Sequence, residues 1–296
     1  MKKLFFFAAA AAALISCQDK NLDIDPKPSE DEKLPINLSL EVSTKVTDTQ
    51  FENGDAVGIY VVSYNGATAG TLENGGNLYD NVKFTYNGSW TSAESMYWKD
   101  KSTKADFYCY HPYGAPANVN AYSFVTSADQ SSENDYKASD FLWGKTAGVT
   151  PTAEVVQVGT KHILSKVVID VKHGDGFTAE SFAAATIKVG IRSVKTAATI
   201  NLSNGEVTAA GAAAEVTPFK DGNLYRAIVV PQSVANSASL IVVTVDGVEY
   251  ALRKGFTFVS GKQHKFTVTV NKTGSGVNVG ITDWETDDND NGGSAE

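Results

Sequence analysis

Cysteine, histidine and positive charge are all scarce in this chain of 296 residues. Two cysteines cannot build a disulfide scaffold, so the fold must depend on an apolar core. The four histidines, His111, His162, His173 and His264, lack the spacing of a zinc site. Lysine and arginine total 25 against 34 acidic residues, and the resulting net charge of −9 argues against nucleic acid as a partner.

Long hydrophobic runs are also lacking, apart from residues 4–15 near the N-terminus. At about 1.5 Å per residue this run is too short to cross a hydrocarbon layer about 30 Å thick. Lys2 and Lys3 precede it, which is the pattern of an export signal. The run ends in Leu14-Ile15-Ser16-Cys17, which resembles the lipobox of bacterial lipoprotein precursors.

The lipobox resemblance implies that residues 1–16 are a signal peptide and that the Cys17 thiol carries diacylglycerol. The new amino group would carry a further acyl chain such as palmitate, and several acyl chains give durable membrane anchoring. An ordinary secretory signal that contains a cysteine is the alternative. Residues 17–33 combine acids, lysines and prolines, and we expect a flexible tether there. Residues 285–296 are acidic and glycine-rich, which predicts a disordered tail.

Between these ends the apolar residues recur with a period of two, as in β-strands. One such series is Ile36, Leu38, Leu40 and Val42, and others occur at residues 163–171 and 266–270. Asn-Gly and Asp-Gly pairs are frequent and favour tight hairpin turns, most clearly within residues 241–250. Only residues 178–185 carry a helix signal. The pattern predicts an all-β fold built of sandwiches.

A small, polar stretch at residues 145–153 predicts a domain boundary. It divides the chain into an N-terminal β-sandwich at residues 34–150 and a C-terminal one at residues 151–284, each long enough for a sandwich.

The sequence contains no pattern typical of an active site or of a cofactor site. It has no Gly-x-Ser-x-Gly nucleophile elbow, and Cys109 lies in an aromatic run that favours a buried structural thiol. We therefore expect no catalytic residue, no metal and no cofactor. The N-terminal half is rich in aromatic residues, including Trp90 and Trp98, which we expect to fill the core. Exposed rings that bind glycans are the alternative.

Several segments, taken in order, resemble the fimbrillin family, the type V pilins and related lipoproteins of Bacteroides-type bacteria. The segments are the lipobox, residues 44–60, Trp90, residues 97–98, 105–113, 140–143, 162–167, 258–262 and 281–284. The resemblance implies two transthyretin-like β-sandwiches in tandem. It also implies a structural or adhesive role at the cell surface, as a lipid-anchored protein of the outer membrane or as part of a fimbrium.

The family resemblance further implies assembly by strand exchange with other pilus subunits. A protease removes the lipid and the first strand, and a C-terminal strand of a neighbouring subunit fills the groove. The first-strand residues would be Ile36, Leu38, Leu40 and Val42. The donor candidates, which also alternate, are Val277, Val279 and Ile281. A host or bacterial surface ligand is a further partner that the resemblance implies.

The candidate cleavage position departs from the pattern of the best-known members, which are cut after arginine. The matching residue is Lys45, and the arginines lie at positions 192, 226 and 253. Either a protease that accepts lysine acts at Lys45, or the protein stays lipidated as an anchor or accessory subunit. The alternative function is a monomeric surface lipoprotein that binds glycans through Trp90 and Trp98.

Overall fold

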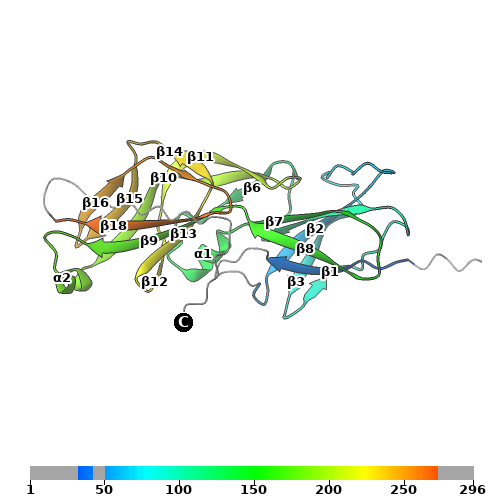
Figure 1. Ribbon diagram of the computed structural model, residues 1–296, viewed down its shortest axis with the longest axis horizontal. Helices are drawn as coiled ribbons and strands as arrows, with labels where there is room; N and C mark the ends of the chain where they lie inside the picture. The colour runs from blue at the N-terminus through cyan, green and yellow to red at the C-terminus, as the bar shows by residue number, and fades with distance from the viewer. Residues whose placement is uncertain (1–32, 43–50, 273–296) are drawn as a thin grey trace, which may run out of the picture. The chain divides into compact units, whose positions relative to one another are not determined.

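A computed structural model describes residues 33–42 and 51–272 of the chain (Figure 1). Its described residues are mostly β-strand, and from Leu34 onward they belong to one compact unit. The predicted all-β class is therefore confirmed. Lys45, Cys17 and the candidate donor residues lie outside the described residues.

The first sheet has seven strands in the order β1-β8-β7-β5-β2-β3-β4. Its strands are β1 (Asn37–Val42), β2 (Ala56–Ser63), β3 (Tyr79–Tyr86), β4 (Trp90–Ser92), β5 (Ala105–His111), β7 (Leu142–Val149) and β8 (Val155–His162). All neighbours pair antiparallel except β1 and β8, which are parallel. The sheet continues to His162, twelve residues beyond the boundary predicted at residue 150.

Three smaller sheets form the rest of the described structure. We call the seven-stranded sheet the first half and these three sheets the second half. The strands of a five-stranded sheet are β6 (Tyr122–Val125), β10 (Ile187–Asn201), β11 (Glu206–Val216), β15 (Ser239–Val245) and β16 (Val248–Arg253). Those of a four-stranded sheet are β9 (Ser165–His173), β12 (Phe219–Asp221), β13 (Leu224–Val229) and β18 (Gln263–Val270). A two-stranded sheet contains β14 (Gln232–Val234) and β17 (Phe256–Phe258). The last strand, β18, pairs parallel with β9.

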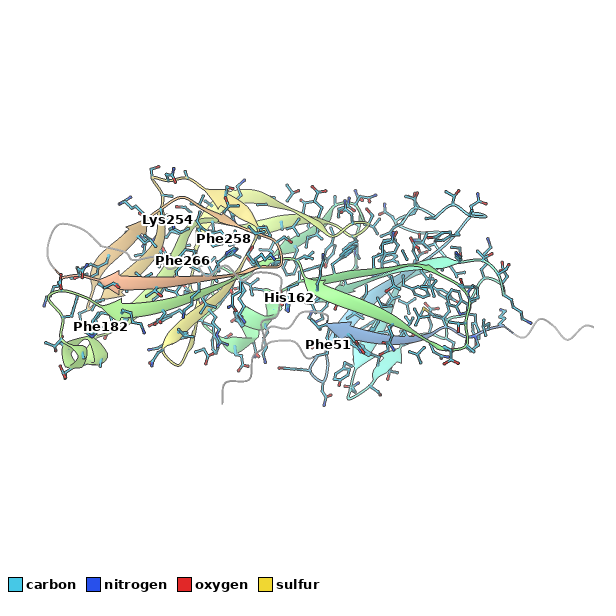
Figure 2. All side chains as sticks on the ribbon, viewed as in Figure 1. Phe51, His162, Phe182, Lys254, Phe258 and Phe266 are labelled. Carbon is cyan, nitrogen blue, oxygen red and sulfur yellow. The ribbon has the colours of Figure 1, made fainter. Side chains whose placement is uncertain are left out.

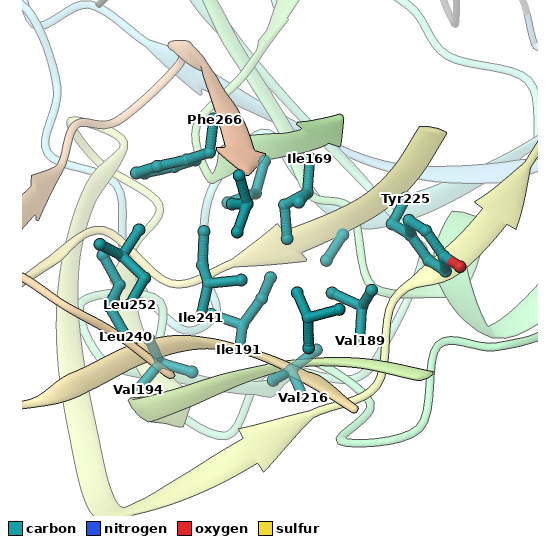
Figure 3. Packing of buried hydrophobic residues seen from close by; sticks show 14 of the residues in the cluster. Ile169, Val189, Ile191, Val194, Val216, Tyr225, Leu240, Ile241, Leu252 and Phe266 are labelled. Carbon is teal, nitrogen blue, oxygen red and sulfur yellow. The ribbon is translucent and has the colours of Figure 1, made fainter. Parts of the chain in front are cut away.

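Two of these sheets face each other across an apolar core (Figure 3). Ile169, Tyr225 and Phe266 come from the four-stranded sheet, and Ile191 and Leu252 from the five-stranded sheet. The alternation of β18 that the sequence predicts is confirmed, because its apolar residues at positions 266, 268 and 270 are all buried. The second half is therefore a β-sandwich.

The seven-stranded sheet has an apolar cluster on each of its faces. One cluster contains Ile36, Leu40, Val57 and Phe107 and belongs to the first half alone. The other joins aromatic residues of β5 and β7 to residues of β10 and β13 in the second half. Because this second cluster is shared, the two halves have a common apolar core as well as one core each.

Local sequence signals account for the hairpin turns and for one helix. Asp246 and Gly247 both have positive φ angles, 50° and 85°, and join β15 to β16 in the predicted hairpin. Helix α2 (Ala179–Ala184) begins at a capping box formed by Thr178 and Ser181, within the predicted range. Helix α1 (Glu133–Ala138), capped by Ser132, is not predicted by the sequence analysis, because one buried residue in six gives no helical period.

Candidate functional site

The first strand lies at the edge of the seven-stranded sheet. β1 pairs with β8 in an unbroken parallel register from Asn37 opposite Val155 to Val42 opposite Thr160. Its other flank has no ladder with any strand in the part of the chain that the structure describes. β1 therefore occupies a slot that is bordered by a complete strand on one side only.

The apolar side chains at β1 are buried to different degrees. Ile36 just before the strand is 7% exposed and Leu40 is 5% exposed, and both belong to the apolar cluster of the first half. Leu38 is half-buried and packs against that cluster, and Val42 is half-buried. Full burial of an aliphatic side chain contributes about 1.5–3 kcal/mol. Ile36 and Leu40 therefore carry most of the apolar attachment of this strand.

Two backbone hydrogen bonds hold the chain where it leads into β1. The Ile36 N–H donates to the carbonyl of Met96 at 2.9 Å, and the Trp98 N–H donates to the carbonyl of Leu34 at 2.9 Å. The Asn37 side chain adds a bond from Nδ2 to the carbonyl of Ala153 at 3.1 Å. The segment is thus fixed at its start from both sides, although the strand itself has a ladder on one side.

Two side chains contact the far end of β1. The indole Nε1 of Trp90 donates to the carbonyl of Leu40 at 3.2 Å, and the Thr160 hydroxyl donates to the carbonyl of Glu41 at 3.0 Å. Phe51, which is labelled in Figure 2, packs edge-on against Trp90 with ring centres 4.7 Å apart. The hydrogen bonds from Trp90 and Thr160 are thus both made to main-chain atoms of β1.

A shallow groove of about 640 Å³ lies beside β1. Its lining residues are Leu38, Ser39, Leu40, Glu41, Tyr86, Gly88, Ser89, Trp90, Val155 and Gln157. They come from β1, from the start of β8 and from the hairpin between β3 and β4. The groove therefore brings β1, its partner β8 and the β3–β4 hairpin to one hollow in the surface.

The aromatic residues of the first half mainly fill cores, as the sequence analysis expects. Trp98 is 4% exposed and its Nε1 donates to the carbonyl of Thr152 at 3.0 Å. It therefore presents no ring face for the alternative of glycan binding. Trp90 is half-buried, with its N–H bonded to Leu40. Tyr113 is the most exposed tyrosine among the described residues, at 37%.

The titratable side chains show no arrangement for metal binding within residues 33–42 and 51–272, where no group of three or more metal-ligating side chains converges. Cys109 is a free thiol, fully buried in β5, as predicted, and burial raises its pKa well above the usual range. His111 ends β5 and precedes Pro112. Among the helices that the structure describes, none is long and apolar enough to cross a membrane.

Comparison with known proteins identifies the family of this all-β chain. A model of the family described as fimbrillin-like matches residues 44–284. The chain belongs to the fimbrillin-like family. This match begins two residues after the end of β1 and spans both halves and the candidate donor segment, so it supports the resemblance inferred from the sequence.

Three proteins similar to this fimbrillin-like chain come from Bacteroides species. A protein of Bacteroides uniformis named as a candidate fimbrium subunit, Fim1C, is 29% identical over 88% of the chain and 87% of that protein. A crystal structure of a candidate cell adhesion protein from Bacteroides uniformis is 26% identical, with a TM-score of 0.64, over 86% of the chain and 99% of that structure. A candidate cell adhesion protein from Bacteroides ovatus shares the fold, with a TM-score of 0.68 at 17% identity over 86% of the chain and 99% of that structure.

The structure places next to β1 several residues that the sequence analysis did not connect with this strand. Trp90 and Thr160 are far from β1 in the chain, and neither alternation nor spacing links them to it. Met96 and Trp98 hold the start of the segment through backbone groups, which every residue type except proline offers. The sequence analysis named Trp90 among the aromatic residues of the N-terminal half and in the family resemblance, but gave it no role at the first strand.

Proposed function

We propose that this fimbrillin-like chain is a structural subunit of a fimbrium or a related surface adhesin, assembled by replacement of β1. The observation that carries the proposal is the placement of β1 as an edge strand whose apolar side chains fill the core. An edge strand with alternating apolar residues can be replaced by another strand with the same alternation. The fimbrium and cell adhesion names of the relatives support a role of this kind.

The proposed assembly begins with a cut after Lys45, which lies three residues beyond the end of β1. The cut leaves β1 attached only by its ladder, its side chains and the bonds at its two ends. Val277, Val279 and Ile281 of another subunit then enter the vacated slot. Full burial of two aliphatic side chains, as at Ile36 and Leu40, would contribute roughly 3–6 kcal/mol before entropic costs.

Delivery to the surface would depend on Cys17 in this proposal. Acyl chains on Cys17 would hold the precursor in the outer membrane, and residues 17–33 would span the distance to the fold. The cut at Lys45 separates the lipid from the folded part, so release and opening of the slot would occur in one step. Labelling with a palmitate analogue, lost in Cys17→Ser, tests this anchoring.

The cleaving protease must accept lysine if this proposal holds. The arginines lie in strands of the second half, at positions 192, 226 and 253. Arg192 is also held by Glu215 at 2.6 Å and by Glu249 at 2.7 Å. Cleavage at any of these residues would break a strand and would not release β1.

The test is limited digestion of the purified full chain with trypsin, followed by N-terminal sequencing and electron microscopy. We expect a product that begins at Val46 and that forms polymers as β1 is released. The Lys45→Gln variant should remain uncut at this position and monomeric. A chain without residues 273–296 should be cut normally but form no polymer. A fully cut wild-type chain that keeps β1 and stays monomeric would contradict the proposal.

A further inference from the structure

The two side-chain bonds at the far end of β1 reach successive carbonyl groups. Trp90 bonds to the carbonyl of Leu40 and Thr160 to that of Glu41. Successive carbonyls of an extended strand point to opposite edges. Trp90, from β4, therefore holds the strand on its open flank, and Thr160 holds it on the flank that pairs with β8.

Both donors are fixed in place by surroundings other than β1. The Trp90 ring packs against Phe51 and also lies 5.3 Å from the Tyr86 ring, centre to centre. Thr160 is 1% exposed and sits within the β8 strand. Phe51 is also the first described residue after the candidate cleavage segment, so a cut at Lys45 leaves this support attached to the folded part. The donors are therefore held in position for a main-chain carbonyl.

We propose that Trp90 and Thr160 form a main-chain clamp that holds whichever extended strand occupies the slot of β1. This inference rests on the proposed replacement of β1 and names how the slot recognises its occupant. A bond to a backbone carbonyl does not depend on the side chain of the residue that supplies it. The clamp therefore selects an extended backbone, and it accepts strands of different sequence.

The side-chain requirement of the slot is correspondingly narrow. The two deeply buried positions are Ile36 and Leu40, four residues apart, while Leu38 between them is half-buried. We infer that an occupant needs large aliphatic residues at positions i and i+4, with wider tolerance at i+2. Val277 and Ile281 have this spacing. The C-terminal segment of a second copy of this chain can meet both requirements.

Hydrogen exchange of the intact chain tests the clamp without any cleavage. Trp90→Phe and Thr160→Val each remove one donor and keep most of the side chain. We expect amide exchange in residues 37–42 to accelerate by about fivefold in each variant, the factor for one net hydrogen bond. Trp143→Phe and Thr146→Val are matched controls, because each removes a bond of the same kind to Leu202 or Gln157. Equal acceleration in variants and controls would overturn the clamp.

A peptide exchange experiment then tests the clamp and the proposed replacement of β1 separately. A site-specific protease sequence placed within residues 43–50 is cut after folding, and fluorescent peptides of residues 33–42 or 274–284 compete for the slot. The clamp predicts that both peptides bind and that each dissociates about fivefold faster from Trp90→Phe and Thr160→Val. Binding of the first peptide alone would overturn replacement by the donor segment and leave the clamp on β1 intact. Binding of both with unchanged dissociation in the variants would overturn the clamp alone, and binding of neither would overturn both.

Discussion

The indole Nε1 of Trp143 donates a hydrogen bond to the carbonyl of Leu202, 2.8 Å away. Trp143 lies in β7 of the first sheet, and Leu202 begins the turn between β10 and β11 of the second half. Both side chains are buried in the cluster that the two halves share. This single contact therefore lies where the first sheet and the long β10–β11 hairpin form one core.

Replacement of Trp143 by phenylalanine tests the energetic weight of that contact. The Leu202 carbonyl would lose its indole donor in a buried setting, which costs about 1–3 kcal/mol. We expect the free energy of unfolding of Trp143→Phe to fall by this amount in urea titrations, with one cooperative transition. A Trp90→Phe chain should lose less, because Trp90 is half-buried. Two separate transitions in the wild-type chain would contradict a shared core.

Gly205 in the same turn should tolerate no side chain. Its φ angle is +75°, and an added Cβ would lie 2.5 Å from Cε3 of Trp143. Gly222→Ala is the matched control, since Gly222 has a φ angle of +59° and open space around it. Both variants carry the backbone strain of about 1–2 kcal/mol, and overpacking adds about 1–3 kcal/mol only in Gly205→Ala. Equal losses of unfolding free energy in the two variants would show that the turn moves to make room for the added Cβ at position 205, and would contradict the prediction.

Substitutions on the two faces of β1 should have different effects on stability. Leu40→Ala removes a side chain that is 5% exposed, and we expect a loss of about 2–4 kcal/mol of stability. Ser39→Ala, one residue away on the other face, should change stability by about 0.5 kcal/mol or less. Thermal unfolding measures both. Similar losses would mean that β1 does not hold the observed register.

Asp106 and Lys145 form an ion pair next to the bulge between β5 and β7. The Asp106 carboxylate is fully buried, with Oδ2 2.9 Å from the Lys145 Nζ and Oδ1 accepting from the Gly148 N–H at 2.7 Å. Lys145→Met leaves this carboxylate without its cation, and we expect a loss of up to about 3 kcal/mol. The double variant Lys145→Met with Asp106→Asn should recover part of the loss. Chemical denaturation of the wild-type chain, the single variant and the double variant measures the free energy of unfolding. A double variant less stable than Lys145→Met would contradict the prediction.

Cys109 should be inert in the native protein. Its side chain is fully buried and burial raises its pKa, so little thiolate forms at neutral pH. In a Cys17→Ser chain, where Cys109 is the remaining thiol, we expect no labelling by a maleimide until denaturant is added. Mass spectrometry before and after unfolding measures how much maleimide Cys109 has taken up. Rapid native labelling would indicate that β5 opens frequently.

The sequence by itself determined the class of fold and the faces of its strands. Alternation at residues 36–42 and 266–270 specified which side chains point inward, because a strand exposes successive side chains to opposite faces. The Asp-Gly pair at residues 246–247 specified a hairpin, since both residues adopt positive φ angles there. These features depend on residues close together in the chain, so a local pattern was sufficient.

Only the tertiary structure decided where those strands pair and what surrounds them. The alternation of β1 fits an edge or a central position equally well, and its parallel partner β8 lies more than one hundred residues further along the chain. The same is true of Trp90 and Thr160 at the slot and of Trp143 against Leu202. Such contacts follow from the packing of distant segments, which a short-range pattern does not encode.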